Sequence, residues 1–299
     1  MALSNSPGQY REVGSTLPPG SCDCHIHVFD TARFPLSSTR VYTPDEAPVD
    51  DLERHLEQLG IERVVIVQAS PYGGDNSCLL DAIEKVGQER ARGVAVISSD
   101  SPTQLLDRLY AGGVRGIRLN LQTYGDADLE TVVEKLKALF DRLAPLGWHL
   151  QLYVSLDRLA TLKPYLQAAP IDIVIDHLGC LDAARGLDQP GFPELLKLLD
   201  SGRIYLKLSA FYRVSTRDDY ADVKSFIDVL VAARPDRLLW GSDWPHTFSA
   251  TGERRSPDRV EPFHPEDDGY ALGLLLRWID DADTARTILS DNPARLYWS

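Results

Sequence analysis

The sequence contains little cysteine, little positive charge and no long apolar run. Its 299 residues include only four cysteines, too few and too scattered for a disulfide framework, so we expect reduced thiols. Its 31 lysines and arginines are outnumbered by 44 aspartates and glutamates, which gives a formal charge of −13. An acidic surface repels nucleic-acid phosphates and anionic lipids, so we expect neither as a partner. An anionic ligand would therefore need a local group of positive charges.

No apolar stretch approaches the roughly 20 residues that a membrane span requires. The N-terminal segment MALSNSPGQYREVGS also has no basic region followed by an apolar one, so it does not resemble a secretory signal. We expect a cytoplasmic protein, either a monomer or a small homo-oligomer. No linker rich in proline, glycine or serine divides the chain, and this absence predicts a single barrel-sized domain.

Short apolar runs alternate with longer amphipathic stretches, which is typical of β/α units around a parallel sheet. Eight runs are predicted strands, at 22–29, 63–69, 93–98, 115–121, 148–154, 171–178, 203–209 and 237–244. Helices are predicted between them where apolar residues recur every three or four positions, for example at 49–60, 78–90, 129–144 and 222–234. We predict an N-terminal arm at 1–20 and a (β/α)8 TIM barrel at 21–299. The alternative, a doubly wound open sheet, is disfavoured because no glycine-rich phosphate loop follows the first strand.

Several polar residues fall where the predicted strands end, and catalytic groups of a barrel cluster at that rim. His25 and His27 lie two residues apart near the end of the first predicted strand, so they share a face. His177 closes the sixth strand and Asp243 the eighth, while Gly241 leaves space inside the barrel. Three imidazoles and one carboxylate at one rim favour a catalytic site over independent structural roles.

Other polar residues are expected to share the inward faces of their strands: Arg118 with Asn120, Gln151 with Tyr153, and Lys207 with Ser209. Asp176 precedes an inward residue, so we expect it to face away from the lumen as a structural partner. His55 and His149 are expected to be hydrogen-bonded structural histidines, because His149 opens its strand at the opposite rim. The charged, proline-containing stretch 247–268 follows the last strand and is a candidate lid.

Four segments in order, CDCHIHVFD, IVIDHLGC, LLWGSDWPH and DNPARLYW, resemble the amidohydrolase superfamily, in the branch that contains 2-pyrone-4,6-dicarboxylate lactonase. The likeness extends over nearly the whole chain from about residue 18. That branch also includes sulfomuconolactone hydrolases and a galactarolactone isomerase. The resemblance therefore implies a hydrolase that opens a carboxylated lactone, whether pyrone dicarboxylate-like, muconolactone-like or derived from a sugar acid.

The residues leave the question of a metal open. A hydrolytic zinc site needs about three protein ligands and an open position, and His25, His27 and Asp243 could supply them with His177 nearby. Metal-binding members of the superfamily usually add a lysine, glutamate or histidine on the fourth or fifth strand. The corresponding positions here hold Arg118 or Asn120 and Gln151 or Tyr153. The pyrone lactonases that the chain resembles work without metal, so we expect no cofactor, with zinc or another divalent ion as the alternative.

The resemblance also implies a mechanism. Without metal, the three histidines would hydrogen-bond the lactone carbonyl and stabilise the oxyanion. Asp243 would take a proton from the attacking water and return it to the leaving oxygen. In a lactone isomerase an internal hydroxyl would replace that water. The isomerase of this branch has asparagine at the position of Asp243, so the aspartate favours hydrolysis. A non-catalytic binding protein would need a broken set of residues, and this set is complete.

The substrate contacts implied by the resemblance are Ser70, Arg118, Tyr153 and Arg213. Carboxylates favour arginine because its planar fork forms paired hydrogen bonds. His246 is expected to orient the substrate or brace its loop. Gln122, Tyr124 or Tyr212 is expected to meet the hydroxyls of a sugar-acid substrate. Two arginines of the lactonase are replaced, by Cys180 and by Tyr124. We therefore expect an anionic lactone with one carboxylate, or a sugar-acid lactone, as the small-molecule partner.

Overall fold

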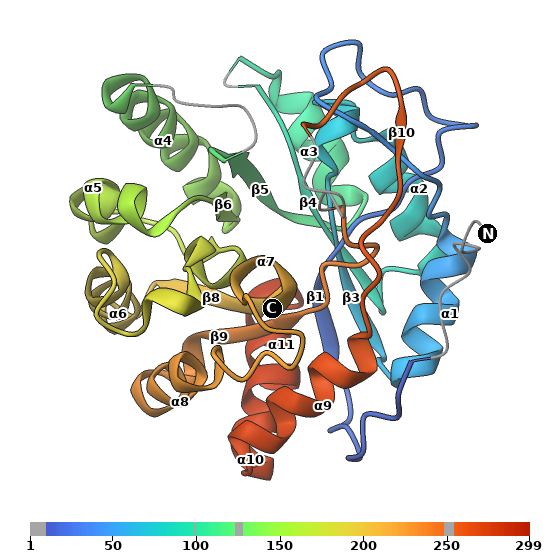
Figure 1. Cartoon of the computed structure of the whole chain (residues 1–299). Helices are drawn as coiled ribbons and strands as arrows, with labels where there is room; N and C mark the ends of the chain where they lie inside the picture. Colours follow the sequence, from blue (N-terminus) through green and yellow to red (C-terminus); the bar gives the residue numbers. More distant parts are fainter. Residues whose placement is uncertain (1–9, 99, 123–127, 248–253) are drawn as a thin grey trace.

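The computed structural model describes residues 10–98, 100–122, 128–247 and 254–299. Eight parallel strands follow one another around a single sheet, and a parallel bridge between Ile26 and Trp244 brings its two ends together. The strands are β1 Cys22–Ile26, β3 Arg63–Val67, β4 Ala91–Ala95, β5 Val114–Asn120, β6 His149–Tyr153, β7 Ile173–Ile175, β8 Ile204–Ser209 and β9 Leu238–Gly241. The predicted (β/α)8 barrel is confirmed, with helices surrounding the strands (Figure 1).

The helices are α1 Val49–Leu59, α2 Ser77–Val86, α3 Thr103–Ala111, α4 Leu129–Leu143, α5 Leu156–Gln167, α6 Phe192–Asp200, α7 Phe211–Val214, α8 Lys224–Ala233, α9 Asp268–Ile279, α10 Ala282–Arg286 and α11 Asn292–Tyr297. Short 3-10 helices are η1 Ser70–Tyr72, η2 Ala144–Leu146, η3 His177–Cys180, η4 Ala183–Arg185 and η5 Pro235–Arg237, and η6 Thr287–Asp291 is a π-helical segment. In α4, the Asp128 carboxylate caps the first turn by accepting from the Thr131 amide. Its apolar residues then recur every three or four positions and are buried against the sheet.

The floor of the barrel is apolar and is closed by the last helix. Cys22, Cys24, Tyr205 and Tyr297 pack there with valines of the inner strand faces. Asn292 fixes α11 beneath the strands by donating to two backbone carbonyls. All four cysteines are free, as the sequence predicts, and the apolar floor leaves polar chemistry to the opposite rim.

A β-bulge in β1 decides where its side chains point. Asp23 pairs with Val64 and Ile26 with Ile66, so β1 contains one residue more than β3 over the same distance. The extra residue lets Cys24 join the floor while His25 also turns into the lumen, where it meets Lys207. Bulges commonly redirect side chains beside active sites. The Asp23 carboxylate faces outward and accepts the backbone amides of His25 and Ser242, which fastens β1 to the end of β9.

Segments from the beginning and from the end of the chain pack against one another outside the barrel strands. The backbone of the N-terminal arm approaches α9 so closely that a Cβ on Gly269 would lie 2.0 Å from the Arg11 carbonyl oxygen. On the mouth side, the short strands β2 (Thr43–Pro44) and β10 (Val260–Glu261) pair in parallel. Within the described ranges, every helix is too short or too polar to cross a lipid bilayer.

Candidate active site

The four residues predicted to form the catalytic centre meet in the mouth of the barrel. The Nε2 atoms of His25, His27 and His177 lie 3.6, 3.8 and 3.7 Å from Asp243 Oδ1. All four side chains are buried. These separations exceed a normal hydrogen bond, so the three ring nitrogens surround one carboxylate oxygen without bonding to it directly. An oxygen atom of a ligand could bridge them.

Two of the four residues follow their strands in a left-handed backbone conformation. His177 (φ 50°) comes after β7 and Asp243 (φ 69°) after β9. Side chains other than glycine rarely adopt this conformation, because the Cβ approaches the carbonyl oxygen. At both positions it turns the chain across the rim of the barrel. The side chains thereby reach the mouth from beyond the strands themselves.

The prediction that Asp176 faces away from the lumen is wrong. Val174 packs inside the barrel, so strand alternation also brings Asp176 inside. The left-handed His177 then bends back over the mouth, and two consecutive residues face the site. Asp176 Oδ1 lies 3.2 Å from His25 Nδ1 and 3.4 Å from Lys207 Nζ.

Asp176 is the centre of a buried layer of charges directly below the three histidines of the mouth. Its Oδ2 accepts from Arg118 Nε at 3.3 Å and from Gln151 Nε2 at 3.1 Å. Lys207 Nζ also donates to Gln151 Oε1 at 2.8 Å. Burial by itself opposes ionisation of Asp176, but the positive charges of Lys207 and Arg118 outweigh it and hold its pKa well below the usual range. The layer fixes the inward-facing side chains of β5, β6 and β8.

The histidines are held in their neutral forms. Burial lowers the pKa of His27 and of His177 to about 4, and it lowers the pKa of His25 well below its usual value. His27 Nδ1 lies 2.8 Å from the Val67 carbonyl oxygen. Because a carbonyl can only accept, Nδ1 carries the proton and Nε2 presents a lone pair to the site. Neutral His27 is therefore an acceptor there.

The two oxygens of Asp243 have different surroundings. Oδ2 accepts hydrogen bonds of 2.7 Å from Tyr212 Oη and Arg213 Nε, and Arg213 Nη2 forms an ion pair with it, also at 2.7 Å. Oδ1 has no hydrogen-bond partner within the described part of the chain. Burial alone would raise the pKa of this carboxyl, but the charge of the Arg213 guanidinium outweighs it and holds that pKa well below its usual range. Oδ1 is thus an ionised oxygen that is open to a ligand in the mouth.

A small cavity lies above this centre, at the mouth of the barrel. Its lining is almost entirely polar: His27, Tyr42, Ser70, Arg118, Asn120, Tyr153, His177, Arg213, Asp243, Thr247 and Arg255. Ser70, Arg118, Tyr153 and Arg213, for which substrate contacts are predicted, are therefore all in its wall. Arg118 lies 5.3 Å above the Tyr153 ring, and burial raises the pKa of Tyr153 to about 12. The Arg213 fork, however, is directed at Asp243.

The sequence reasoning did not single out Tyr42 or Arg255 for this cavity. Both belong to segments without helical or strand periodicity, and their approach depends on the distant pairing of β2 with β10. In the sequence, the high charge and proline content of the segment after β9 is the one signal that points to this part of the cavity wall. Tyr124 lies outside the described residues.

His246 is placed differently from its predicted role in substrate binding. It is outside the cavity wall, and its Nε2 lies 3.1 Å from Asp268 Oδ1. Burial would lower the pKa of His246, but Asp268 outweighs it and raises that pKa. The left-handed conformation of His246 (φ 71°) follows the turn after Asp243 and directs the ring behind Tyr212. The structure thus favours the bracing role.

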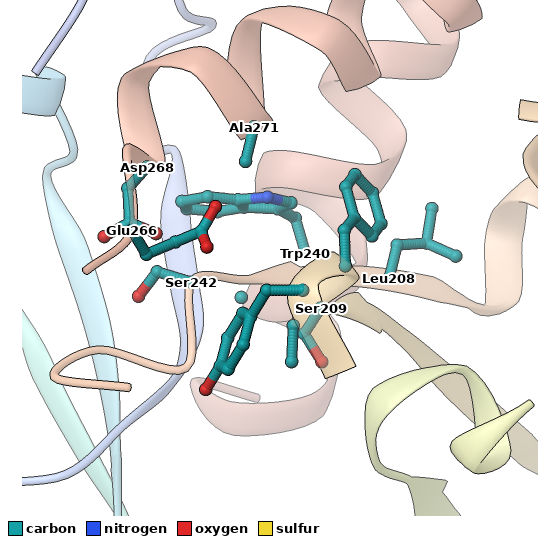
Figure 2. A pocket seen from close by; sticks show the side chains of 11 residues that line it. Leu208, Ser209, Trp240, Ser242, Glu266, Asp268 and Ala271 are labelled. Atoms are coloured by element: carbon teal, nitrogen blue, oxygen red, sulfur yellow. The ribbon is translucent and has the colours of Figure 1, made fainter. Parts of the chain in front are cut away.

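A separate small pocket lies on that side of the barrel wall, next to the start of α9. Figure 2 shows the carboxylates of Glu266 and Asp268 together beside Ser242, at the indole of Trp240. Burial raises the pKa of Glu266, and Tyr220 Oη donates to it at 2.5 Å. This cluster supports α9 and the turn that carries Asp243.

The donor atoms of the mouth fit a divalent ion. His25 Nε2 and Asp243 Oδ1 are buried without partners among the described residues, and with His27 they form a set whose ligand atoms lie within 4.8 Å of one another. The charges fit an ion less well. Lys207, Arg118 and Arg213 already outnumber Asp176 and Asp243 by one positive charge, and a dication would enlarge that excess.

The barrel, the His-x-His of its first strand, and the histidine and aspartate beyond later strands define the amidohydrolase class of barrel enzymes. The amidohydrolase family matches the chain over residues 22–298, and the protein belongs to it.

The similar proteins span nearly the whole chain. The 4-sulfomuconolactone hydrolase of Hydrogenophaga intermedia is 34% identical over 94% of this chain and 89% of its own length. A 2-pyrone-4,6-dicarboxylate hydrolase of Comamonas testosteroni is 34% identical over 94% and 91%. The crystal structure of a probable 2-pyrone-4,6-dicarboxylic acid hydrolase from Acinetobacter baumannii, with citric acid bound, has a TM-score of 0.79 and 28% identity, covering 94% of this chain and 100% of that one.

Proposed function

We propose that this protein hydrolyses a lactone that carries a carboxylate, with Asp243 as general base. The observation that carries the proposal is the ionised Oδ1 of Asp243, free of other partners in the described chain and surrounded by three imidazoles below a polar cavity. Two relatives at 34% identity are named as lactone hydrolases. Their names support cyclic ester hydrolysis here.

In the proposed reaction, water attacks the lactone carbonyl carbon while Asp243 Oδ1 takes one of its protons. The carbonyl becomes a tetrahedral oxyanion, the ring C–O bond breaks, and the proton passes to the leaving oxygen. The product is a ring-opened carboxylate. Because Tyr212 and Arg213 occupy Oδ2, they orient the carboxylate so that Oδ1 alone exchanges the proton.

The histidines then have unequal roles in the proposal. Neutral His27 accepts a hydrogen bond at Nε2 and so orients the water. His177 Nδ1 lies 2.9 Å from Ser209 Oγ, and when the serine donates, His177 Nε2–H can donate to the oxyanion. His25 can do the same when Lys207 donates to its Nδ1. The three rings therefore do not act alike, although the sequence predicts one shared role for them. His25 and His177 donate hydrogen bonds to the oxyanion, whereas His27 accepts one from the water.

The charge of the mouth supports an anionic substrate. The buried side chains carry one net positive charge, which a single carboxylate would balance. We assign that carboxylate to Arg118, whose Nε is engaged by Asp176 and whose guanidinium lines the cavity. Arginine is suited to such recognition because several N–H groups point in one plane.

We propose that the reaction proceeds without metal, since the charge balance already suits the anion. If a divalent ion binds, His25, His27, His177 and Asp243 would hold it, and it would polarise the lactone carbonyl. In both cases the proton is handled by Asp243.

The proposal is tested with Asp243→Asn on a panel of pyrone dicarboxylate, muconolactones and aldarolactones. We expect at least a 100-fold lower kcat, because the amide cannot accept the proton. Ligand binding, measured by thermal shift, should persist. Asp141→Asn, on the exposed side of α4, is the matched control. Unchanged turnover in Asp243→Asn would refute the role, and a rearranged lactone in place of a hydroxy acid would indicate an isomerase.

A further inference from the structure

The described chain after β9 is fastened across the edge of the cavity. We call residues 254–261 the strap. The Pro257 carbonyl accepts from Thr43 Oγ1 at 2.6 Å and from Arg40 Nη2 at 3.1 Å. Further along, β10 pairs with β2. These bonds fix the strap to the segment that carries Tyr42, which lines the cavity.

Within the strap, Arg255 is turned toward the cavity. Its guanidinium lies 3.4 Å above the Tyr42 ring, and its side chain is 24% exposed. Arg254 and Arg259 on the same strap are exposed to solvent. An arginine that served only to fasten the strap would not need to enter the cavity wall, yet Arg255 lines it together with Tyr42 and Thr247.

The hydrogen bonds of Arg255 hold it in place and leave one edge of its fork unused. Nε donates to Glu261 Oε2 at 3.1 Å, and Nη2 donates to Glu261 Oε1 and to the Thr247 carbonyl, both at 2.5 Å. Nη1 has no hydrogen-bond partner within the described ranges. A guanidinium that is stacked and paired on one side loses little conformational freedom when it binds a ligand on the other.

We propose that Arg255 binds an anionic substituent of the substrate and so determines which lactones the enzyme accepts. This inference rests on the proposed lactone hydrolysis and specifies its substrate. Glu261 balances the charge of Arg255, so Arg255 adds directed N–H donors without adding net charge. An acidic group near the strap, such as a second carboxylate, would satisfy Nη1 in addition to the carboxylate that Arg118 binds in the mouth.

The decisive experiment compares a lactone that carries a second carboxylate with the methyl ester of that second carboxylate, in the wild type, Arg255→Gln and the control Arg259→Gln. The control removes the same charge from the exposed side of the same strap. In Arg255→Gln we expect kcat/KM for the acid to fall roughly 10- to 100-fold, mainly through KM, because a hydrogen bond to a charged group is lost. The ester should change less than threefold, and Arg259→Gln should leave both substrates unchanged.

Equal losses for acid and ester would show that Arg255 only fastens the strap, and would overturn the inference. If Arg255→Gln does not fold, Glu261→Gln provides the second test, because it keeps Arg255 and frees its guanidinium. The preference for acid over ester should then be retained or increase, whereas its loss would count against Arg255.

Failure of the proposed function is recognised separately. If the wild type opens no lactone, citrate is used as the probe, and its binding is measured by calorimetry in the same variants. Weaker citrate binding in Arg255→Gln but not in Arg259→Gln would uphold the anion site without lactone hydrolysis. Equal binding in both variants would refute it.

Discussion

His149 is a buried histidine at the floor of the barrel, at the opposite end of β6 from the candidate active site, and it makes the free energy of unfolding depend on pH. Its side chain is 2% exposed, its ring lies edge-on to Tyr297 at 5.1 Å, and Gly116 leaves the space that it fills. Neither ring nitrogen has a hydrogen-bond partner of normal geometry among the described residues, contrary to the predicted hydrogen-bonded role. Burial, aided by the charge of Lys207, lowers its pKa to about 3.

The size and sign of the effect follow from this pKa. An unfolded histidine has a pKa of about 6.5, so between pH 6.5 and 3 the unfolded chain binds a proton that the folded chain excludes. The free energy of unfolding therefore decreases as the pH falls through this window, by about 1.4 kcal/mol per pH unit. From pH 6.5, where the unfolded histidine is half protonated, to pH 4.5, the contribution of His149 is about 2 kcal/mol. Above pH 7 both states are neutral and the contribution disappears.

The prediction is measured by urea unfolding of the wild type and His149→Leu at pH 4.5, 5.5, 6.5 and 7.5. The variant should lose less stability on acidification, so its free energy of unfolding relative to that of the wild type should rise by about 2 kcal/mol from pH 6.5 to 4.5. The other buried histidines are common to both proteins and cancel in the comparison. His149→Gln serves as a second variant if leucine fits poorly. Parallel pH profiles would show that His149 titrates normally, and the reasoning would then be wrong.

Two further perturbations address the mouth. In Gly241→Ala, the new Cβ would lie 2.8 Å from the His25 Cβ and 2.9 Å from the His25 backbone nitrogen, so His25 must move. We expect kcat to fall about 10- to 100-fold with little change in KM. An unchanged kcat would contradict the need for space at Gly241. Metal content should be well below one equivalent, and activity should survive dialysis against a chelator; loss of activity with recovery on adding zinc would instead identify His25, His27 and Asp243 as ligands.

The fold and much of the site could be predicted because both depend on local regularities. Strand alternation and helical periodicity indicate the eight β/α units, and the ends of parallel strands then place His25, His27 and Asp243 at one rim. The errors occur where the backbone departs from those regularities. The bulge in β1 lets both Cys24 and His25 face inward, and the turn after β7 brings His177 over the mouth although regular alternation already places Asp176 in the lumen. Nothing in a local pattern signals either change.

The strap shows a second limit of sequence reasoning. Arg255 reaches the cavity because Glu261, Thr43 and Tyr42 hold it there, and these partners include residues more than 200 positions away. Charge content identified the segment as a candidate lid but not the residue that faces inward. Long-range pairing decides that orientation, and a single sequence does not reveal it.

The left-handed backbone at His177 and Asp243 bears on function independently of any relative. A non-glycine residue in this conformation costs on the order of 1 kcal/mol. Glycine would make either turn without that cost, but it would remove an imidazole or a carboxylate from the mouth. The imidazole of His177 and the carboxylate of Asp243 therefore account for why these positions keep a strained, non-glycine residue. His177 Nε2 and Asp243 Oδ1 face each other across 3.7 Å. Backbone strain at both residues is expected if both side chains are needed for the same chemistry.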